Sequence, residues 1–230
     1  MTLCIIPARG GSKRIPRKNI KIFNGKPMIA HSILAAKNSG CFERIIVSTD
    51  DTEIAQISQQ YGAEVPFTRP AELSDDFATT GTVMAHAVDF MLKQGNWQGK
   101  MACCLYATAP FVLASDLQIG ATKLREMGAD FAFSLTDYAF PIQRALKLSE
   151  NGEVAMFQPE MFAVRSQDLA RAWHDAGQFY WGTVAAWLTQ KPIFNSQSVG
   201  VKLPRYRVQD IDTPDDWERA ELLAKILQAA

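Results

Sequence analysis

An apolar run near the start of the chain, Leu3 to Ile6, leads directly into a basic loop. The run predicts a buried central strand of a parallel sheet, and ligands of such sheets gather at the carboxyl ends of the strands. Ten residues of the loop hold five cationic side chains, Arg9, Lys13, Arg14, Arg17 and Lys18. Gly10 and Gly11 lack the Cβ atoms that would keep a ligand away from backbone amides. The loop therefore predicts a nucleoside triphosphate site.

The spacing of this loop matches neither of the two common nucleotide motifs. It is not the phosphate loop G-x-x-x-x-G-K-[ST], and it contains no G-x-G-x-x-G for a dinucleotide. A solvated basic loop that simply follows a strand is the alternative interpretation, because charge runs often form solvated surfaces.

Apolar, strand-like runs alternate with helical patterns along most of the chain. Strands are predicted over residues 3–6, 44–49, 63–67, 101–106, 130–135, 199–203 and 205–211. Helices are predicted over residues 28–39, 51–61, 80–92, 115–127 and 214–227. This alternation is typical of an α/β fold with a doubly wound, mainly parallel, Rossmann-like sheet, in which right-handed crossovers bring the strand-end loops to one side. With 47% hydrophobic residues, a chain of 230 residues can bury one core, so we expect a single domain over 1–230.

The alternating pattern is interrupted after residue 136. Two short apolar runs flank Asn151-Gly152, which is a strong hairpin signal. The segment from about 138 to 185 is also rich in aromatic residues, namely Phe157, Phe162, Trp173, Phe179, Tyr180 and Trp181. We expect a small hairpin-containing insertion that makes a dimer contact, with an ordinary satellite core as the alternative.

Composition argues against several classes of partner. The formal net charge is zero and the sequence pI is about 6.8, so no nucleic-acid or membrane partner is expected. No apolar run approaches the roughly 20 residues of a membrane span, and no signal segment precedes the first strand. The four cysteines lack zinc-ligand spacing and are expected to be reduced thiols of a cytoplasmic protein.

Two carboxylates flank Ile211 at the end of a predicted strand. Because strand side chains alternate, Asp210 and Asp212 are expected on the same side of the backbone. Such a pair can hold Mg²⁺ or Mn²⁺, which prefer oxygen ligands and share them with substrate phosphates. The alternative is that Asp212 only caps the helix that begins near Pro214.

Six segments of the chain resemble one known family. They read PARGGSKRIPRKNI, NGKPMIAHSI, RPAELSDDFATT, YATAPF, DAGQFYWGT and VQDIDTPDDW. They are similar to the CMP-N-acetylneuraminic acid synthetase family of nucleotidyltransferases, and most similar to its pseudaminic acid cytidylyltransferase branch. The resemblance covers nearly the whole chain and implies an enzyme that joins CTP to a nine-carbon 2-keto sugar acid and releases diphosphate. It also implies a magnesium ion and a homodimer.

The resemblance assigns roles to individual residues. It implies catalytic roles for Arg9, Lys18 and Asp212, and metal binding by Asp210 and Asp212. The nucleotide-binding residues would be Ala8, Arg9, Gly11, Ser12, Lys13, Lys18, Asn19, Arg69, Ala78 and Thr80. The sugar-binding residues would be Tyr106, Thr108, Arg144, His174, Gln178 and Tyr180. Arg144 could pair with the sugar carboxylate or be a surface residue, and His174 could be a general base or a structural residue.

The identity of the acceptor stays open in part. A pocket with few charges, walled by Tyr106, Phe179, Tyr180 and Trp181, would favour a 6-deoxy sugar with two N-acyl groups, as in pseudaminic acid. N-acetylneuraminic or legionaminic acid are the alternative acceptors. A non-catalytic nucleotide-binding module is a further alternative, but such a module would not need the two aspartates or an aromatic pocket.

Overall fold

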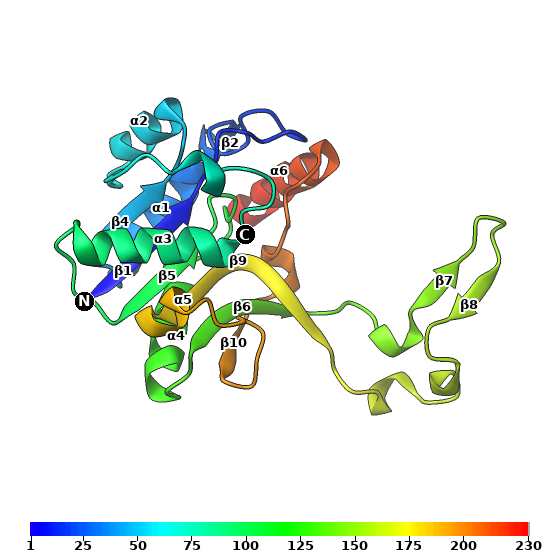
Figure 1. The fold of residues 1–230 in the computed structure, drawn as a ribbon. Helices are drawn as coiled ribbons and strands as arrows, with labels where there is room; N and C mark the ends of the chain where they lie inside the picture. The colour runs from blue at the N-terminus through cyan, green and yellow to red at the C-terminus, as the bar shows by residue number, and fades with distance from the viewer. Residues whose placement is uncertain (230) are drawn as a thin grey trace.

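A six-stranded sheet forms the centre of the fold in the computed structural model, which describes residues 1–229 (Figure 1). The strands lie side by side in the order β4 (Arg44–Ser48), β1 (Thr2–Pro7), β5 (Met101–Leu105), β9 (Trp173–Thr183), β6 (Phe131–Asp137) and β10 (Ser198–Lys202). Neighbouring strands are parallel except that β9 runs antiparallel to both β5 and β6. The predicted α/β class with a mainly parallel sheet is therefore confirmed.

Helices cover both faces of the sheet. One face packs against α1 (Met28–Ser39), α2 (Thr52–Gln60) and α4 (Ala114–Glu126), and the other against α3 (Thr80–Lys93) and α5 (Val184–Leu188). In β1, Cys4 and Ile6 join the first core while Leu3 and Ile5 join the second, which explains the uninterrupted apolar run. Among residues 1–229, none of the helices combines the length and the apolar character that a membrane span needs.

The C-terminal helix α6 (Pro214–Ala229) fixes the loop that follows β1. A third apolar cluster joins Trp217 of α6 to Ile15 of the loop and to Phe23 of the short hairpin β2 (Ile22–Phe23) and β3 (Lys26–Pro27). The Phe23 and Trp217 rings meet edge to face, with their centroids 5.5 Å apart. This packing holds the basic loop in place before any ligand binds.

An arm, residues 138–172, projects from the body of the protein (Figure 1). It contains the hairpin β7 (Leu146–Leu148) and β8 (Val154–Met156) and three single turns, η2 (Ile142–Arg144), η3 (Pro159–Met161) and η4 (Ser166–Asp168). The hairpin predicted around Asn151-Gly152 is confirmed, and Gly152 takes the positive φ of 83° that the turn requires.

Three parts of the predicted secondary structure are wrong. The insertion ends before β9, since residues 173–183 form an interior strand whose aromatic run is buried on both faces. Residues 63–67 make a single isolated bridge, from Glu64 to Ile46 of β4, because Pro66 has no N–H group to donate. Residues 205–211 form a single turn, η5 (Arg205–Arg207), followed by irregular backbone rather than a strand.

Candidate functional site

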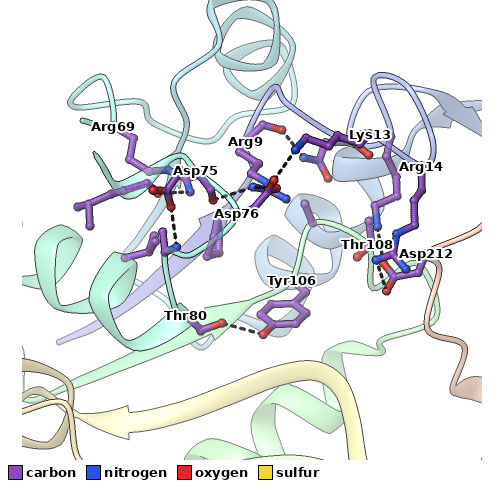
Figure 2. A pocket seen from close by; sticks show the side chains of 18 residues that line it. Arg9, Lys13, Arg14, Arg69, Asp75, Asp76, Thr80, Tyr106, Thr108 and Asp212 are labelled. Carbon is purple, nitrogen blue, oxygen red and sulfur yellow. Dashed lines mark hydrogen bonds and ion pairs between the residues drawn. The ribbon is translucent and has the colours of Figure 1, made fainter. Parts of the chain in front are cut away.

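Two adjoining pockets lie at the carboxyl ends of the strands. The basic pocket has a volume of about 540 Å³ and is lined by Pro7, Arg9, Ser12, Lys13, Arg14, Lys18, Asn19, Arg69, Leu73, Asp75, Asp76, Ala78, Thr80, Val83, Tyr106, Ala107, Thr108 and Asp212 (Figure 2). The acidic pocket has a volume of about 460 Å³ and is lined by Tyr106, His174, Asp175, Ala176, Gly177, Tyr180, Val208, Gln209 and Asp210. Tyr106 contributes to both walls.

The backbone of the basic loop is fixed by the neighbouring strand-end loop. The Gly10 amide donates to Asp50 Oδ1 at 2.9 Å, and the Asn19 side chain donates to the Arg9 carbonyl at 3.0 Å. A Cβ atom at Gly10 would lie 2.8 Å from Asp51 Oδ2, so any other residue there would require the Asp51 side chain to shift. Open space surrounds Gly11, which does not line the pocket.

One of the five loop cations has a structural role. Arg17 pairs with Asp51 and Glu53 at the start of α2 and does not line the basic pocket. Hydrogen bonds from Arg17 lower the pKa of Asp51, and the same bonds raise the pKa of Arg17. The other four cations, Arg9, Lys13, Arg14 and Lys18, line the pocket.

Carboxylates form ion pairs with the exposed cations of the basic pocket. Arg9 and Lys13 pair with Asp76 at 2.8 and 2.5 Å, as Figure 2 shows. Arg14 pairs with Asp212 at 2.8 Å, and Lys18 donates to the same carboxylate at 3.1 Å. Partial burial alone would raise the pKa of Asp212, but the bonds and charges of Lys18 and Arg14 lower it. An anionic ligand in this pocket would compete with Asp76 for Arg9 and Lys13.

Arg69 is a buried cation without a carboxylate partner among residues 1–229. Its residue is 5% exposed, and its guanidinium donates to the carbonyls of Ser48 at 2.5 Å and Leu73 at 3.3 Å. Its Nε group has no partner. Burial lowers the pKa of Arg69, although a guanidinium remains charged at neutral pH. A buried, unpaired charge is costly, so the pocket is built to receive an anion.

The wall shared by the two pockets is held by hydroxyl groups. Tyr106 and Thr80 share a hydrogen bond of 2.9 Å between their hydroxyls, and Ser32 donates to the Tyr106 carbonyl at 2.8 Å. Burial raises the pKa of Tyr106 to about 12, so its hydroxyl stays protonated. Tyr106 therefore has a protonated hydroxyl and lines both pockets.

A buried ion pair anchors the segment that carries Asp210 and Asp212. The Arg207 guanidinium makes a two-pronged contact with Asp116 of α4, at 2.6 and 3.0 Å, with side-chain exposures of 12% and 7%. The Gln178 side chain also donates to the Arg207 carbonyl at 2.7 Å. These contacts fix the backbone just before the two aspartates.

Asp212 does not cap the last helix. Thr213 and Asp216 cap it instead: the Asp216 amide donates to Thr213 Oγ1 at 3.2 Å, and Asp216 Oδ2 accepts from the Thr213 amide at 2.9 Å. Ile211 is buried, so Asp210 and Asp212 lie on either side of an apolar anchor. Asp212 lines the basic pocket and Asp210 the acidic one.

Asp210 and Asp212 offer carboxylate oxygens, the ligand type that a hard divalent cation prefers, and each lines a different pocket. Desolvation by the surrounding protein is the larger cause that raises the pKa of Asp210, and the negative charge of Asp212 is the second. The residue is nonetheless exposed at the wall of the acidic pocket. No three His, Cys, Asp or Glu side chains of residues 1–229 cluster as a metal cage. Two oxygen ligands suit magnesium, which takes its remaining ligands from water and substrate phosphates.

The structure brings most of the predicted site residues together. Those in the basic pocket are Arg9, Ser12, Lys13, Lys18, Asn19, Arg69, Ala78, Thr80, Tyr106, Thr108 and Asp212. Those in the acidic pocket are Tyr106, His174, Tyr180 and Asp210. Ala8, Gly11, Arg144 and Gln178 line neither pocket.

Two of these outliers have clear structural roles. Gln178 is 2% exposed and bonds to the backbone of Arg207, and Arg144 lies in the arm, where it donates to the Val164 carbonyl at 2.6 Å. Arg144 of this chain is therefore not placed to pair with a sugar carboxylate in the pockets of the same chain.

The expected aromatic wall with few charges is wrong. Phe179 and Trp181 are fully buried on the opposite face of β9, so two of the four predicted aromatic residues, Tyr106 and Tyr180, line the acidic pocket. Sequence reasoning also missed Asp75 and Asp76 as pocket residues. The adjacent pair Asp75-Asp76, a few residues after Arg69, was the signal that could have found them.

A doubly wound sheet with a cation-lined pocket at its strand ends defines a nucleotide-binding α/β protein. The chain belongs to the cytidylyltransferase family, whose sequence model matches residues 3–220. It is 48% identical to a pseudaminic acid cytidylyltransferase of Campylobacter jejuni over 97% of this chain and 96% of that protein. It is 31% identical to CMP-N,N'-diacetyllegionaminic acid synthase of Legionella pneumophila over 99% of this chain and 98% of that one.

A solved structure shares the fold. It is that of CMP:2-keto-3-deoxy-manno-octonic acid synthetase complexed with CTP, with a TM-score of 0.69, 19% sequence identity, and coverage of 100% of this chain and 99% of that chain. This similarity places the present chain in the same fold class.

Proposed function

We propose that this protein transfers the CMP group of CTP to pseudaminic acid, a nine-carbon 2-keto sugar acid, and releases diphosphate. The observation that carries the proposal is the basic pocket, in which buried Arg69 and four loop cations face one another at the strand ends. The choice of acceptor is supported by the full-length identity of 48% to a pseudaminic acid cytidylyltransferase, against 31% to a legionaminic acid synthase.

The reaction is a displacement at phosphorus. The anomeric hydroxyl oxygen of the sugar bonds to the α-phosphorus of CTP, the bond from that phosphorus to the bridging oxygen breaks, and diphosphate leaves while the hydroxyl proton is released. The protein's task is positioning and charge neutralisation. Arg9, Lys13 and Lys18 would hold the phosphates, and Ala78 with Thr80 would lie beside the nucleoside.

Asp210 and Asp212 would hold a magnesium or manganese ion between the two pockets. When bound, such an ion polarises phosphate oxygens and offsets the negative charge that the phosphates accumulate. The remaining chemistry falls to the chain itself, with Lys18 and Arg14 orienting the Asp212 carboxylate.

The arm suits a two-fold dimer. Phe140, Leu148 and Phe162 of the arm are 83%, 74% and 77% exposed, an unusual amount of bare apolar surface for a short segment. We place a second copy of this chain on that surface. Light scattering is expected to give twice the chain mass of 25.5 kDa at micromolar concentration, and a monomer would contradict the dimer.

The four free cysteines fit a reducing compartment, so the proposed location is the cytoplasm. Burial raises the pKa of Cys4 and of Cys103, which face one another on β1 and β5 without forming a disulfide.

A diphosphate-release assay tests the proposed reaction. The wild-type protein is given pseudaminic acid with CTP, UTP, ATP or GTP, before and after treatment with a chelator. We expect turnover with CTP, loss of activity on chelation, and recovery on adding magnesium or manganese. Asp212→Asn is expected to abolish most of the metal-dependent rate. Tight CTP binding without turnover would contradict the proposal and favour a nucleotide-binding module. Activity that survives full chelation would contradict the proposed metal requirement.

A further inference from the structure

Asp175 makes two fixed hydrogen bonds in the acidic pocket. Its Oδ2 atom accepts a hydrogen bond from the Tyr180 hydroxyl at 2.5 Å, and its Oδ1 atom accepts one from the Gly177 amide at 2.9 Å. Burial raises the pKa of Tyr180, so this hydroxyl stays protonated and donates. Among residues 1–229, no lysine or arginine pairs with Asp175. An ionised carboxylate has about four acceptor positions, so two remain for a ligand.

A bulge in β9 creates this arrangement. On β6, Phe133 and Leu135 are two residues apart, whereas their partners on β9, Tyr180 and Asp175, are five apart. The additional residues loop out, and Gly177 takes a left-handed φ of 61° within the loop. In a regular strand, residues five apart point to opposite faces, but the bulge brings Asp175 and Tyr180 within hydrogen-bond distance.

A buried serine stabilises the bulge. Ser134 of β6 is fully buried, and its Oγ accepts from the amides of Gln178 and Phe179, each at 3.2 Å. The Gln178 carbonyl in turn accepts from the Tyr106 amide at 2.9 Å. The position of the Asp175 carboxylate is therefore set by the fold and not by a mobile side chain.

The polar groups of the acidic pocket are mainly acceptors. Asp175 and Asp210 are carboxylates, and the pocket is lined by no lysine or arginine. His174 Nδ1 lies 2.8 Å from the Asp175 carbonyl, which can only accept, so Nδ1 carries a hydrogen. Such a pocket favours hydroxyl and amide N–H groups and repels a carboxylate.

We propose that Asp175 determines acceptor specificity by accepting a hydrogen bond from a hydroxyl or acylamino N–H group of the sugar. The sugar's own carboxylate is directed away from the acidic pocket, toward the cations of the basic pocket. This inference rests on the proposed function and assigns a role to one residue of the sugar site.

Kinetics with two variants and a control test the inference. Asp175→Asn keeps the side-chain shape, and Tyr180→Phe keeps the ring but removes the hydroxyl that holds Asp175. Asp137→Asn is the matched control, because Asp137 lies on the adjoining β6, is paired with Arg205 at 3.7 Å and lines neither pocket. Diphosphate release is measured while pseudaminic acid and CTP are varied in turn.

We expect Asp175→Asn to raise the KM for pseudaminic acid by about tenfold or more, because a hydrogen bond to a charged group is lost, while the KM for CTP stays at its wild-type value. Tyr180→Phe raises the sugar KM less, and Asp137→Asn leaves both values unchanged. Analogues in which a hydrogen atom replaces one hydroxyl or acylamino group identify the donor, since the Asp175→Asn penalty disappears only when the donor itself is removed.

A folded Asp175→Asn protein with the wild-type sugar KM would overturn the inference while leaving the cytidylyltransferase assignment intact. If that variant does not fold, an unchanged sugar KM in Tyr180→Phe overturns it instead. A wild-type protein that releases no diphosphate from CTP with any nine-carbon sugar acid would overturn the proposed function and this inference together.

Discussion

The basic pocket and the acidic pocket share Tyr106 but are built in opposite ways. The basic pocket takes four of its five cations from one short loop, and these cations can receive an anion. The acidic pocket takes its polar groups from a bulge in β9 and from the segment before α6, and it contains no lysine or arginine. Cationic residue types alone are enough to bind a polyanion. A sugar acid, in contrast, also requires hydrogen-bond acceptors at fixed positions. Removing one contact at a time should separate these two tasks.

The largest effect is expected where one contact supports both pockets. Arg207→Ala breaks the buried pair with Asp116 and leaves that carboxylate without its partner, which costs about 3 to 5 kcal/mol of folding stability. Because the segment after Arg207 carries Asp210 and Asp212, we expect activity to fall with both substrates. Thermal unfolding and kinetics measure the two effects. Wild-type stability would show that the ion pair does not anchor this segment.

Lys18→Ala should damage the basic pocket alone. Lys18 donates to the Ile211 carbonyl at 2.6 Å and to Asp212, and it is proposed to hold a phosphate. Losing one preorganised charge contact costs about 2.7 to 4 kcal/mol of transition-state stabilisation, so kcat should fall sharply. Lys26→Ala is the control, because Lys26 is exposed on β3 and lines neither pocket. Near-normal turnover in Lys18→Ala would contradict the proposal that Lys18 holds a phosphate of CTP.

Ser134→Ala should act on the acidic pocket alone. The change leaves the amides of Gln178 and Phe179 without their buried acceptor, at a cost of about 1 to 3 kcal/mol. The bulge should loosen, and the KM for the sugar should rise while the KM for CTP does not. Equal changes in both KM values would show that the two pockets are not independent.

The smallest effect is expected for Asp76→Asn. Asp76 pairs with Arg9 and Lys13 at the exposed edge of the basic pocket, and phosphates must displace it. Exposed pairs are weak, so the KM for CTP should fall by no more than about fivefold, and the change should shrink at high salt. A higher KM for CTP would show that Asp76 assists the nucleotide instead of competing with it.

The sequence predicted the basic pocket better than the acidic one, for physical reasons. Loop cations beside glycines after an apolar strand commonly bind an anionic ligand, and Arg9, Lys13 and Lys18 all line the basic pocket. The aromatic run of β9 was placed in the insertion because burial on both faces of a central strand hides its alternation.

Contacts between distant parts of the chain had no local signal. Arg207 meets Asp116 across 91 residues of sequence. The bulge that joins Asp175 to Tyr180 depends on Ser134, which lies on a different strand. Neither residue type nor spacing indicates such contacts, so the role of Arg207 and the contact of Asp175 with Tyr180 could be identified only from the structure.

The central claim is that CTP and pseudaminic acid are the two substrates of these pockets. Its most direct test is the kcat/KM of the wild-type protein at saturating CTP for pseudaminic acid, legionaminic acid and N-acetylneuraminic acid in turn. We predict the highest value for pseudaminic acid. A value for N-acetylneuraminic acid equal to or above that for pseudaminic acid would contradict the account.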